Sequence, residues 1–497
     1  MTEATRVPRT NEPASDVATE AAALKDDVEA GHSWTARPWV DPTTRGEEAK
    51  AARQRVPRTS HAAFEPAVKR DPIAILEAQE TDRLQHLVPL RHARMAESPF
   101  AYYRGTPAVM AFDLANAPRT DIRVQASGDA HLSNFGLFAS PERALVFDLN
   151  DFDETLPGPW EWDVKRLAAS VVIAGRANGF NAAANRRAAM GTVRDYRRWM
   201  ARFAAMRLVD ILYSTITAAD IIETAEASGL LAGSGGSTRR KAIEALFTKA
   251  RSRDGMRAFG SLTGIVDGRR VILDDPPVLT HVAVDIPGGL ERVFTDYRAS
   301  LPENRRDFLE RYRFLDFALK VVGVGSVGTR CFVLVLQGRD EDDALILQAK
   351  EATASVLEPY LHTTEHPTQG QRVVVGQQLM QANSDIFLGW VRGPGGRDYY
   401  FRQLWDMKGS VETATLRAPG LAVYGALCGR ALARAHARTG DAVAISAYLG
   451  TSDTFDGAIA DFAETYADVN ARDHAAYLAA IKTGRVSNPA NLEADLS

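Results

Sequence analysis

The residues best suited to do chemistry in this 497-residue chain lie in one short run, residues 128–134 (GDAHLSN). An Asp five residues before an Asn on a tight loop offers a base for an acceptor hydroxyl and an oxygen ligand for Mg²⁺, which phosphoryl transfer requires. Asp129 is the candidate catalytic base and Asn134 the candidate metal ligand, while His131 is expected to hold this catalytic loop. The same residue types also satisfy the backbone of ordinary turns, so a structural turn is the alternative.

A group of carboxylates follows the catalytic loop in residues 147–154 (FDLNDFDE). Asp148 ends the second strand of a predicted hairpin and is the preferred ligand for a Mg²⁺ ion that bridges to nucleotide phosphates, with Asp151 as the second choice. Four clustered carboxylates cannot all approach one metal without raising one another's pKa. Asp153 and Glu154 are therefore expected to be solvated or capping residues.

A glycine loop, residues 323–328 (GVGSVG), lies between two predicted strands. Such a hairpin can bring backbone N–H groups against phosphate oxygens without interference from Cβ atoms. A dinucleotide fingerprint needs a helix at the last glycine, whereas residues 329–336 (TRCFVLVL) have the pattern of a strand, so a loop of the protein-kinase type fits better. A purely structural hairpin is the alternative. The expected nucleotide contacts are Gly323, Gly325, Ser326 and Gly328.

The next strand supplies a candidate lysine. Apolar alternation in residues 345–352 (LILQAKEA) ends at Lys350, which is expected to point inward toward the α- and β-phosphates of a nucleotide. An exposed charge at a strand end is the alternative. A following helix should supply a carboxylate partner for Lys350; Glu358 is the choice, with Glu351 and Glu365 as alternatives.

The surrounding pattern predicts the elements that bring these groups together. Val124 opens a strand into the catalytic loop, and residues 135–138 and 144–147 form a hairpin, so the loop and Asp148 lie at neighbouring strand ends. Asp163, at the start of a helix over 162–177, either holds the loop through backbone N–H groups or caps the helix. Further helices are predicted at 73–95, 185–217, 238–251 and within 416–481, and further strands at 321–322, 332–336, 345–348, 386–391 and 399–404.

Two other features have both a functional and a structural interpretation. A basic and aromatic cluster could bind an anionic acceptor, although a contact between a helix and the core is the preferred interpretation; its members are Arg91, Arg94, Tyr102, Tyr103 and Arg104. His436 lies on an alanine-rich helical segment, where a packing or capping histidine is expected rather than a ligand.

Composition limits the class of protein. The formal net charge of −4 gives no global attraction to nucleic acid or to an anionic membrane, so no nucleic-acid partner is expected. Cys331 and Cys428 are far apart and suggest neither a disulfide framework nor a cysteine zinc site, which fits a reducing cytoplasm. The N-terminus lacks an apolar leader and no stretch reaches the apolar length of a membrane span. A cytoplasmic protein without a membrane partner is expected.

The chain resembles a bacterial family known as domain of unknown function 2252. The blocks that carry the resemblance spread over about residues 55–480, and they are residues 98–105, 128–136, 147–154, 160–170, 320–330 and 399–410. The family name implies no particular activity.

The Gly-Asp-x-His-x-x-Asn spacing also resembles the catalytic loop of aminoglycoside phosphotransferases and choline kinases, in which the Asp is catalytic and the Asn binds a metal. Asp129, His131 and Asn134 fall on this pattern. Those kinases place the glycine loop and the lysine before the catalytic loop, whereas Gly323 and Lys350 follow Asp129 by about two hundred residues. The resemblance therefore implies a circularly permuted kinase-like fold, which is physically possible because chain ends can be relocated at surface connections.

The predicted fold is α+β with two kinase-like lobes, one large and helical and the other small, antiparallel and β-rich. Residues 1–60 are expected to form a mobile or loosely docked N-terminal arm, and residues 61–311 the helical lobe with the catalytic loop and the metal-binding hairpin. Residues 312–415 form the nucleotide-binding lobe, and residues 416–497 add helices that complete the helical lobe. Gln403 is then expected near the hinge between the lobes, beside adenine.

We expect a phosphotransferase that depends on ATP and Mg²⁺ and acts on a hydroxyl of a small molecule or, as a second choice, of a protein. Nucleotidyl transfer is an alternative, because the same groups can position the α-phosphate. A nucleotide-binding regulatory protein without turnover and a metal hydrolase built on the carboxylates and His131 are further alternatives. The acceptor and the oligomeric state have no readable signal in the sequence.

Overall fold

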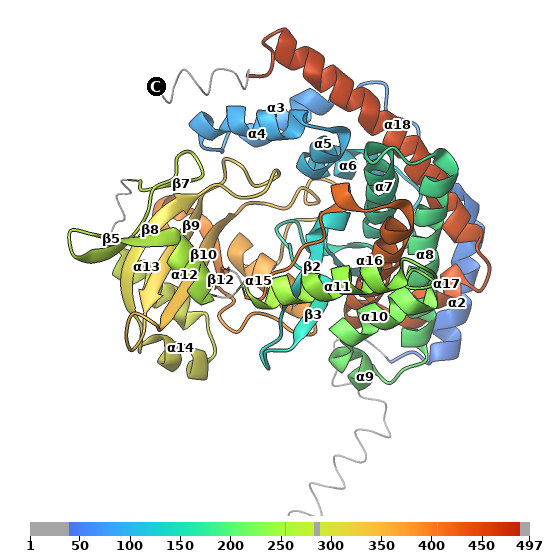
Figure 1. The fold of residues 1–497 in the computed structure, drawn as a ribbon. Coiled ribbons are helices and arrows are strands. Elements are labelled where there is room, and N and C mark those ends of the chain that lie inside the picture. The colour runs from blue at the N-terminus through green and yellow to red at the C-terminus, as the bar shows by residue number, and fades with distance from the viewer. Residues whose placement is uncertain (1–38, 254, 283–288, 405, 488–497) are drawn as a thin grey trace, which may run out of the picture.

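Residues 344–352 build the centre of the main sheet, and all of them except the first are buried. In the computed structural model, which describes residues 39–253, 255–282, 289–404 and 406–487, this segment is strand β10 (Ala344–Ala352). The described residues form an α+β fold in which helices dominate and all strand pairs are antiparallel. Figure 1 shows the main sheet to the left of a large group of helices.

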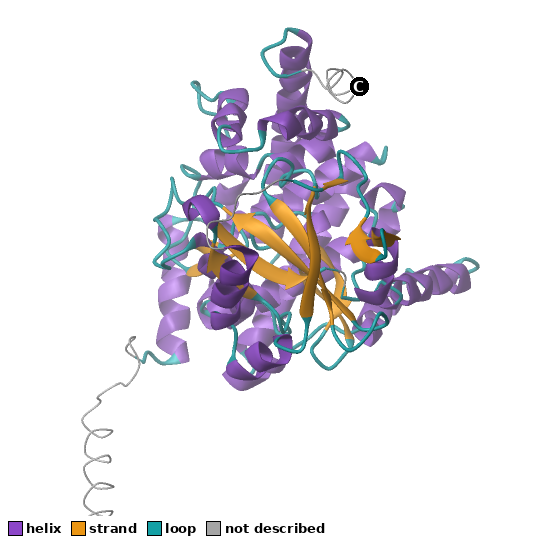
Figure 2. Cartoon of the chain, turned by 90° about the vertical axis from the view of Figure 1, so that its left-hand side faces the viewer, coloured by secondary structure: helices purple, strands orange, loops and turns teal. Residues whose placement is uncertain are grey.

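The main sheet has six strands in the order β11-β12-β10-β9-β8-β7. Their bounds are β7 (Leu279–Thr280), β8 (Arg313–Lys320), β9 (Cys331–Gln337), β11 (Gly389–Arg392) and β12 (Asp398–Gln403). Four helices pack around the sheet, α12 (Gly255–Leu262), α13 (Gly289–Ala299), α14 (Glu303–Leu309) and α15 (Gln369–Met380), and a hairpin of β5 (Thr263–Val266) and β6 (Arg269–Ile272) lies at its edge. In Figure 2 the strands of this sheet face the viewer, with most helices behind them.

Alternation along β10 decides which residues face the rest of the molecule. Leu345, Leu347 and Ala349 belong to the apolar cluster that packs against α13 and α14. Ile346 belongs to the cluster on the opposite face, and because side chains alternate along a strand, Lys350 shares that face. The lysine is buried, so it is not an exposed charge at a strand end.

The helical body carries the largest apolar cluster of the protein. Its long helices are α7 (Trp160–Ala177), α8 (Ala182–Ala204), α16 (Ala418–Thr439) and α18 (Thr454–Lys482). Shorter helices surround them, namely α2 (Pro42–Arg55), α3 (Pro72–Glu80), α4 (Val88–Ala96), α5 (Pro99–Gly105), α6 (Pro107–Leu114), α9 (Leu208–Tyr213), α10 (Ala218–Ala227), α11 (Gly236–Arg251) and α17 (Ala442–Leu449). In the described residues no helix combines the length and the apolar composition needed to cross a membrane.

Two small strand pairs lie between the helices and the sheet. Strand β1 (Arg123–Ala126) pairs with β4 (Leu156–Pro159), and β2 (Phe135–Ala139) pairs with β3 (Leu145–Leu149). They confirm the predicted hairpin and place the catalytic loop between β1 and β2. The segment after the sheet also joins this region, because the backbones of Gly409 and Leu137 exchange hydrogen bonds of 2.7 and 2.9 Å.

Four expectations about the elements need correction. The helix predicted over 185–217 is divided, because α8 ends at Ala204 and α9 spans only Leu208–Tyr213. The helix predicted over 73–95 is divided into α3 and α4, because Pro89 fits only the first turn of a helix and the Leu84 N–H bonds to the Gly328 carbonyl. Residues 321–322 are not a strand, since β8 ends at Lys320. The described residues in 255–282 and 289–309, predicted as part of the helical lobe, lie against the main sheet instead, and β7 pairs with β8.

The predicted N-terminal arm falls partly outside the described residues, which begin at residue 39. Residues 42–55 of the predicted arm form helix α2, which packs against α17. Arg53 donates to the Tyr448 carbonyl over 2.9 Å, and Arg58 donates to the Leu449 carbonyl over 2.6 Å. This half is therefore docked by specific hydrogen bonds.

Close packing of α16 on α8 generates a stability prediction. A Cβ atom on Gly429 would lie 2.3 Å from the Thr192 carbonyl oxygen, whereas a Cβ on Gly457 of α18 would meet no atom within 4 Å. Gly429→Ala should therefore lower the free energy of unfolding by about 1–3 kcal/mol through overpacking. The matched change Gly457→Ala should raise it by about 0.4–1 kcal/mol by reducing the freedom of the unfolded chain. Equal effects of the two changes in denaturant unfolding would contradict this packing.

Candidate active site

A buried carboxylate holds the start of the catalytic loop. Asp163, in the first turn of α7, accepts hydrogen bonds from the backbone N–H groups of Ser127 (2.6 Å) and Gly128 (3.0 Å). This confirms the first of the two roles predicted for Asp163. Gly128 has φ of +78°, and a Cβ atom there would lie 2.5 Å from the Glu154 carbonyl oxygen, so this position requires glycine.

Contact with Asp163 explains the structural role of His436. The His436 Nε2 atom lies 3.1 Å from the Asp163 carboxylate, and its Nδ1 atom lies 2.8 Å from the Tyr196 hydroxyl. His436 is fully buried on α16. The predicted packing histidine is confirmed, and it supports Asp163.

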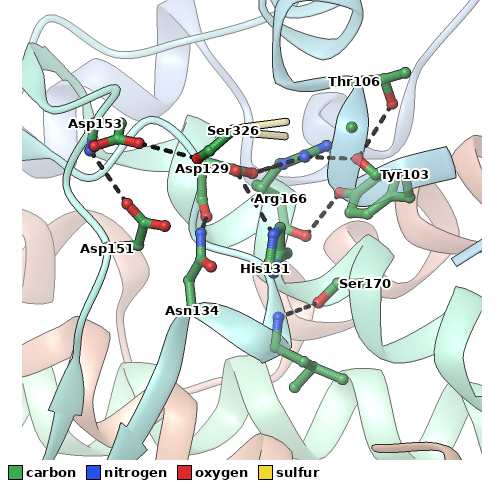
Figure 3. Close-up of polar contacts among 12 residues, drawn as sticks. Tyr103, Thr106, Asp129, His131, Asn134, Asp151, Asp153, Arg166, Ser170 and Ser326 are labelled. Atoms are coloured by element: carbon green, nitrogen blue, oxygen red, sulfur yellow. Dashed lines mark hydrogen bonds and ion pairs between the residues drawn. The ribbon is translucent and has the colours of Figure 1, made fainter. Parts of the chain in front are cut away.

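Asp129 is held by an arginine that the sequence patterns did not indicate. Arg166 of α7 approaches the Oδ1 atom of Asp129 with Nε at 2.8 Å and Nη2 at 2.7 Å (Figure 3). Burial raises the pKa of Asp129 to about 6, although Arg166 opposes this shift. The carboxylate is therefore ionised at neutral pH but more basic than an ordinary Asp, as a general base should be.

His131 and Asn134 shape the loop around Asp129. Burial lowers the pKa of His131 well below its ordinary value, so the ring is neutral, and its Nε2 lies 3.6 Å from the Asp129 Oδ2 atom. The Asn134 amide nitrogen donates to the Asp129 carbonyl over 2.7 Å (Figure 3). That bond leaves the Asn134 side-chain oxygen, a suitable Mg²⁺ ligand, without a hydrogen-bond partner in the described part of the chain.

Asp148, the preferred metal ligand in the sequence, does not reach this loop. It lies within β3, and its side chain forms a buried ion pair with Arg434 of α16. Burial raises the pKa of Asp148, while Arg434 opposes the shift. The order of preference is corrected because the pleat of a strand fixes the direction of Asp148, whereas Asp151 lies beyond the strand end and lines a cavity together with Asp129 and Asn134.

The ammonium group of Lys350 lies near two carboxylates of residues 147–154. It contacts Asp153 closely and lies 3.8 Å from the Asp151 Oδ1 atom. Burial acts to lower the pKa of Lys350, but Asp151 and Asp153 outweigh it and raise the pKa well above its ordinary value. Asp153 also accepts a hydrogen bond from the Tyr400 hydroxyl over 2.7 Å, so it is an ion-pair partner and not a solvated residue.

Two lesser expectations about carboxylates are resolved by their contacts. Glu358 does not pair with Lys350; its carboxylate accepts a hydrogen bond from the Gln369 side chain over 3.0 Å. Glu154 accepts a hydrogen bond from the Val356 N–H over 2.8 Å, which fits the predicted capping role. Burial raises the pKa of Glu154 to about 7.

The glycine loop faces the catalytic loop across one cavity. This first cavity is lined by Asp129, Asn134, Asp151 and Asp153 on one side and by Gly323, Gly325 and Ser326 on the other. The Ser326 hydroxyl lies 3.5 Å from the Asp153 carboxylate (Figure 3). Residues about two hundred positions apart in the sequence therefore share one site.

A second cavity lies on the other side of Lys350 along β10. Gln348 lines it, whereas Glu351 and Thr353 line the first cavity. Gln403, predicted to lie beside adenine, also lines this second cavity, and its side-chain amide donates to Asp385 over 3.0 Å. Lys350 thus stands between two cavities.

Comparison with known protein families gives one decisive match. A model of the family described as "Uncharacterized protein conserved in bacteria (DUF2252)" matches residues 83–480. The chain belongs to this family. No curated protein and no solved structure matches it.

One signal in the sequence could have revealed the arginine partner in this DUF2252 protein. Asp163 and Arg166 are three residues apart on α7, and residues at this spacing lie on one face of a helix. Since Asp163 binds the backbone at the start of the catalytic loop, a cation one turn later is positioned to meet Asp129.

The contrast between Asp148 and Asp151 can be tested by stability. Asp148→Ala should lower the free energy of unfolding by about 3–5 kcal/mol, because it leaves the buried Arg434 charge unpaired. Asp151→Ala should change it by less than about 1 kcal/mol, since Lys350 keeps Asp153 as its closer partner. Chemical denaturation of both variants measures the difference. A large loss for Asp151→Ala with none for Asp148→Ala would contradict these assignments.

Proposed function

We propose that this DUF2252 protein is a phosphotransferase of circularly permuted kinase-like fold, which uses ATP and Mg²⁺ to phosphorylate a hydroxyl of a small molecule. The observation that carries the proposal is the shared first cavity, where the catalytic loop faces the glycine loop. A structural turn and an unrelated glycine hairpin would have no reason to meet in this way.

The order of elements around Lys350 supports the kinase-like part of the proposal. Strands β8 and β9 flank the glycine loop, Lys350 lies on the following strand β10, and helix α15 comes next. Protein kinases carry their phosphate-binding lysine on the third strand of the small lobe, before a helix. The lysine of this protein contacts Asp151 and Asp153 in place of a carboxylate on α15.

Asp129 suits the role of the base that orients an acceptor hydroxyl and accepts its proton. The carboxylate lines the first cavity, and Arg166 contacts it mainly through Oδ1. Its Oδ2 atom is the one directed toward neutral His131, at 3.6 Å. A raised pKa strengthens the base while it stays ionised at neutral pH.

The first cavity has oxygen donors that fit Mg²⁺. In the described residues no three His, Cys, Asp or Glu side chains gather to hold a metal ion by themselves. Magnesium does not need such a group, because it is commonly held by one or two carboxylates together with substrate phosphates and waters. Asn134 and Asp151 are the residues that would hold it, and when bound the ion neutralises phosphate charge.

The two cavities on either side of Lys350 favour one direction for a nucleotide. The nucleobase would lie in the second cavity near Gln403, and the phosphates would extend past Lys350 toward Ser326. Backbone N–H groups of the glycine loop can approach phosphate oxygens there. The acceptor hydroxyl would then enter the first cavity beside Asp129.

Nucleotide binding tests the role of Lys350. Mg²⁺ with ATP should stabilise the wild-type protein against thermal unfolding, by about 2.7 kcal/mol at one hundred times the dissociation constant. Lys350→Met should weaken the affinity at least about tenfold through loss of a charge-assisted contact, while the exposed control Lys241→Met should behave as wild type. Equal stabilisation of all three proteins would refute the nucleotide assignment.

Transfer activity tests the role of Asp129. Asp129→Asn should retain nucleotide binding and folded structure but lose about 10²- to 10⁴-fold in rate, the usual effect of removing a general base. ATP labelled separately at the γ- and α-phosphates measures whether a phosphoryl or a nucleotidyl group is transferred. Label from the α-phosphate in the product would replace the proposal with nucleotidyl transfer, and unchanged activity of Asp129→Asn would exclude this residue as the base.

The raised pKa of Asp129 gives a pH prediction. The base must be ionised, so kcat/KM for transfer should fall about tenfold per pH unit below about pH 6 and level off above it. Nucleotide affinity measured over the same range separates this effect from loss of binding. A flat profile between about pH 5 and 7 would contradict the assignment.

A further inference from the structure

One wall of the first cavity is basic. Arg83, Arg91 and Arg104 line it, from the segment between α3 and α4, from α4 and from α5 respectively. The sequence pattern indicated Arg91 and Arg104 as part of a cluster that suits an anionic acceptor. The contacts of the three arginines decide which of them can bind a ligand.

Both terminal nitrogens of Arg91 are engaged by the protein, although its buried Nε has no partner in the described residues. Its guanidinium forms an ion pair with Glu80 and donates to the Gly105 carbonyl over 2.9 Å. It therefore holds α4 against α5 and α3, as the structural interpretation of the cluster expected.

Arg104 differs from Arg91 because its guanidinium has no hydrogen-bond or ion-pair partner among the described residues. Its Nε atom is buried. Burial lowers the pKa of Arg104, while the nearby carboxylates Asp129 and Asp151 oppose this shift. A shielded guanidinium without a partner is costly, so an anion entering the cavity would gain a strong charge-assisted contact.

Arg83 stands on the same wall with spare donors. One of its terminal nitrogens donates to the Val327 carbonyl over 2.5 Å, but its buried Nε has no partner in the described residues. Burial lowers the pKa of Arg83 to about 9, so it remains charged at neutral pH. Its side chain also packs beside Gly328, at the end of the glycine loop.

We propose that Arg104 and Arg83 bind an oxyanion, either phosphate or carboxylate, carried by the acceptor. The substrates of this DUF2252 protein are then small hydroxyl compounds with a negative group, and this inference rests on the proposed function. Because Arg104 and Asp129 line the same cavity, one acceptor molecule can place its anionic group against the arginine and its reacting hydroxyl beside the carboxylate.

The position of Arg104 favours the acceptor over the nucleotide as its ligand. On β10, Gln348 lines the cavity assigned to the nucleobase, and Lys350 follows it. Glu351, at the end of the strand, and Thr353, just after it, line the cavity that contains Arg104. Lys350 therefore separates Arg104 from the nucleobase. The Arg104 backbone is adjacent to the glycine loop, where a Cβ on Gly325 would lie 3.4 Å from its carbonyl oxygen, but its guanidinium interacts with the charge of Asp129, the proposed catalytic base.

Calorimetric titration of the full chain tests this inference. The protein is first saturated with Mg²⁺ and a non-hydrolysable ATP analogue, and inorganic phosphate and acetate are then titrated separately as probes of the two kinds of oxyanion. At least one should bind with a stoichiometry of one per chain. Arg104→Gln should weaken that binding about tenfold or more, as expected for loss of a charged donor, and Arg104→Lys should restore part of it.

The controls separate folding and nucleotide binding from anion binding. Arg104→Gln should leave the affinity for the analogue and the melting temperature unchanged, because Arg104 has no protein partner to lose. Arg311→Gln, on an exposed arginine, should leave anion binding unchanged.

Three results would overturn the inference: binding of neither anion, binding that Arg104→Gln leaves unchanged, or binding of an anion only when the analogue is left out, which would assign Arg104 to the nucleotide phosphates. Failure of the analogue to bind wild type would instead remove the proposed function and the acceptor site with it.

Discussion

The site depends first on one buried contact, the acceptance of two backbone N–H groups by Asp163. Without this carboxylate the N–H groups of Ser127 and Gly128 would be buried without partners, which is costly for a loop between a strand and a helical core. His436 and Tyr196 complete the arrangement, so residues of α7, α8 and α16 all bear on the start of the catalytic loop. The loop is positioned by the core of the helical body and does not rely on its own turn.

The second constraint is balance of charge inside the first cavity. Asp129, Asp151 and Asp153 lie close together, and like charges in a shielded space must be compensated. Compensation comes from separate parts of the chain: Arg166 on α7 pairs with Asp129, and Lys350 on β10 contacts the other two carboxylates. These contacts join the main sheet to the helical body. The same balance leaves Asp129 with a raised pKa, Asp151 with only a distant contact to Lys350, and Arg104 without a partner in the described residues. A ligand that carries both a metal ion and an anionic group would complement these charges.

Local patterns predicted the parts of the site whose geometry is local. The catalytic loop, the glycine loop and the alternation that points Lys350 inward each depend on a few consecutive residues, and their positions are confirmed as elements of the fold. The errors arose where direction depends on distant packing. Asp148 was preferred over Asp151 because it closes the hairpin beside the catalytic loop. Only the structure shows that the Asp148 carboxylate pairs with Arg434, on a helix almost three hundred residues later. The prediction that Glu358 pairs with Lys350 was wrong for the same reason, because the fold brings Glu358 to the Gln369 side chain instead.

The sequence by itself determined which chemical groups the site contains, the family of the chain, the α+β class and the presence of the catalytic loop and the glycine loop. Those properties follow from backbone preferences and from side-chain alternation, which act over a few residues. Tertiary structure decided which carboxylates meet Lys350, that Arg166 holds Asp129 and that the buried Arg104 Nε has no partner among the described residues. Ionic contacts and burial depend on distances between segments that the chain order does not specify, so only the folded packing could assign them.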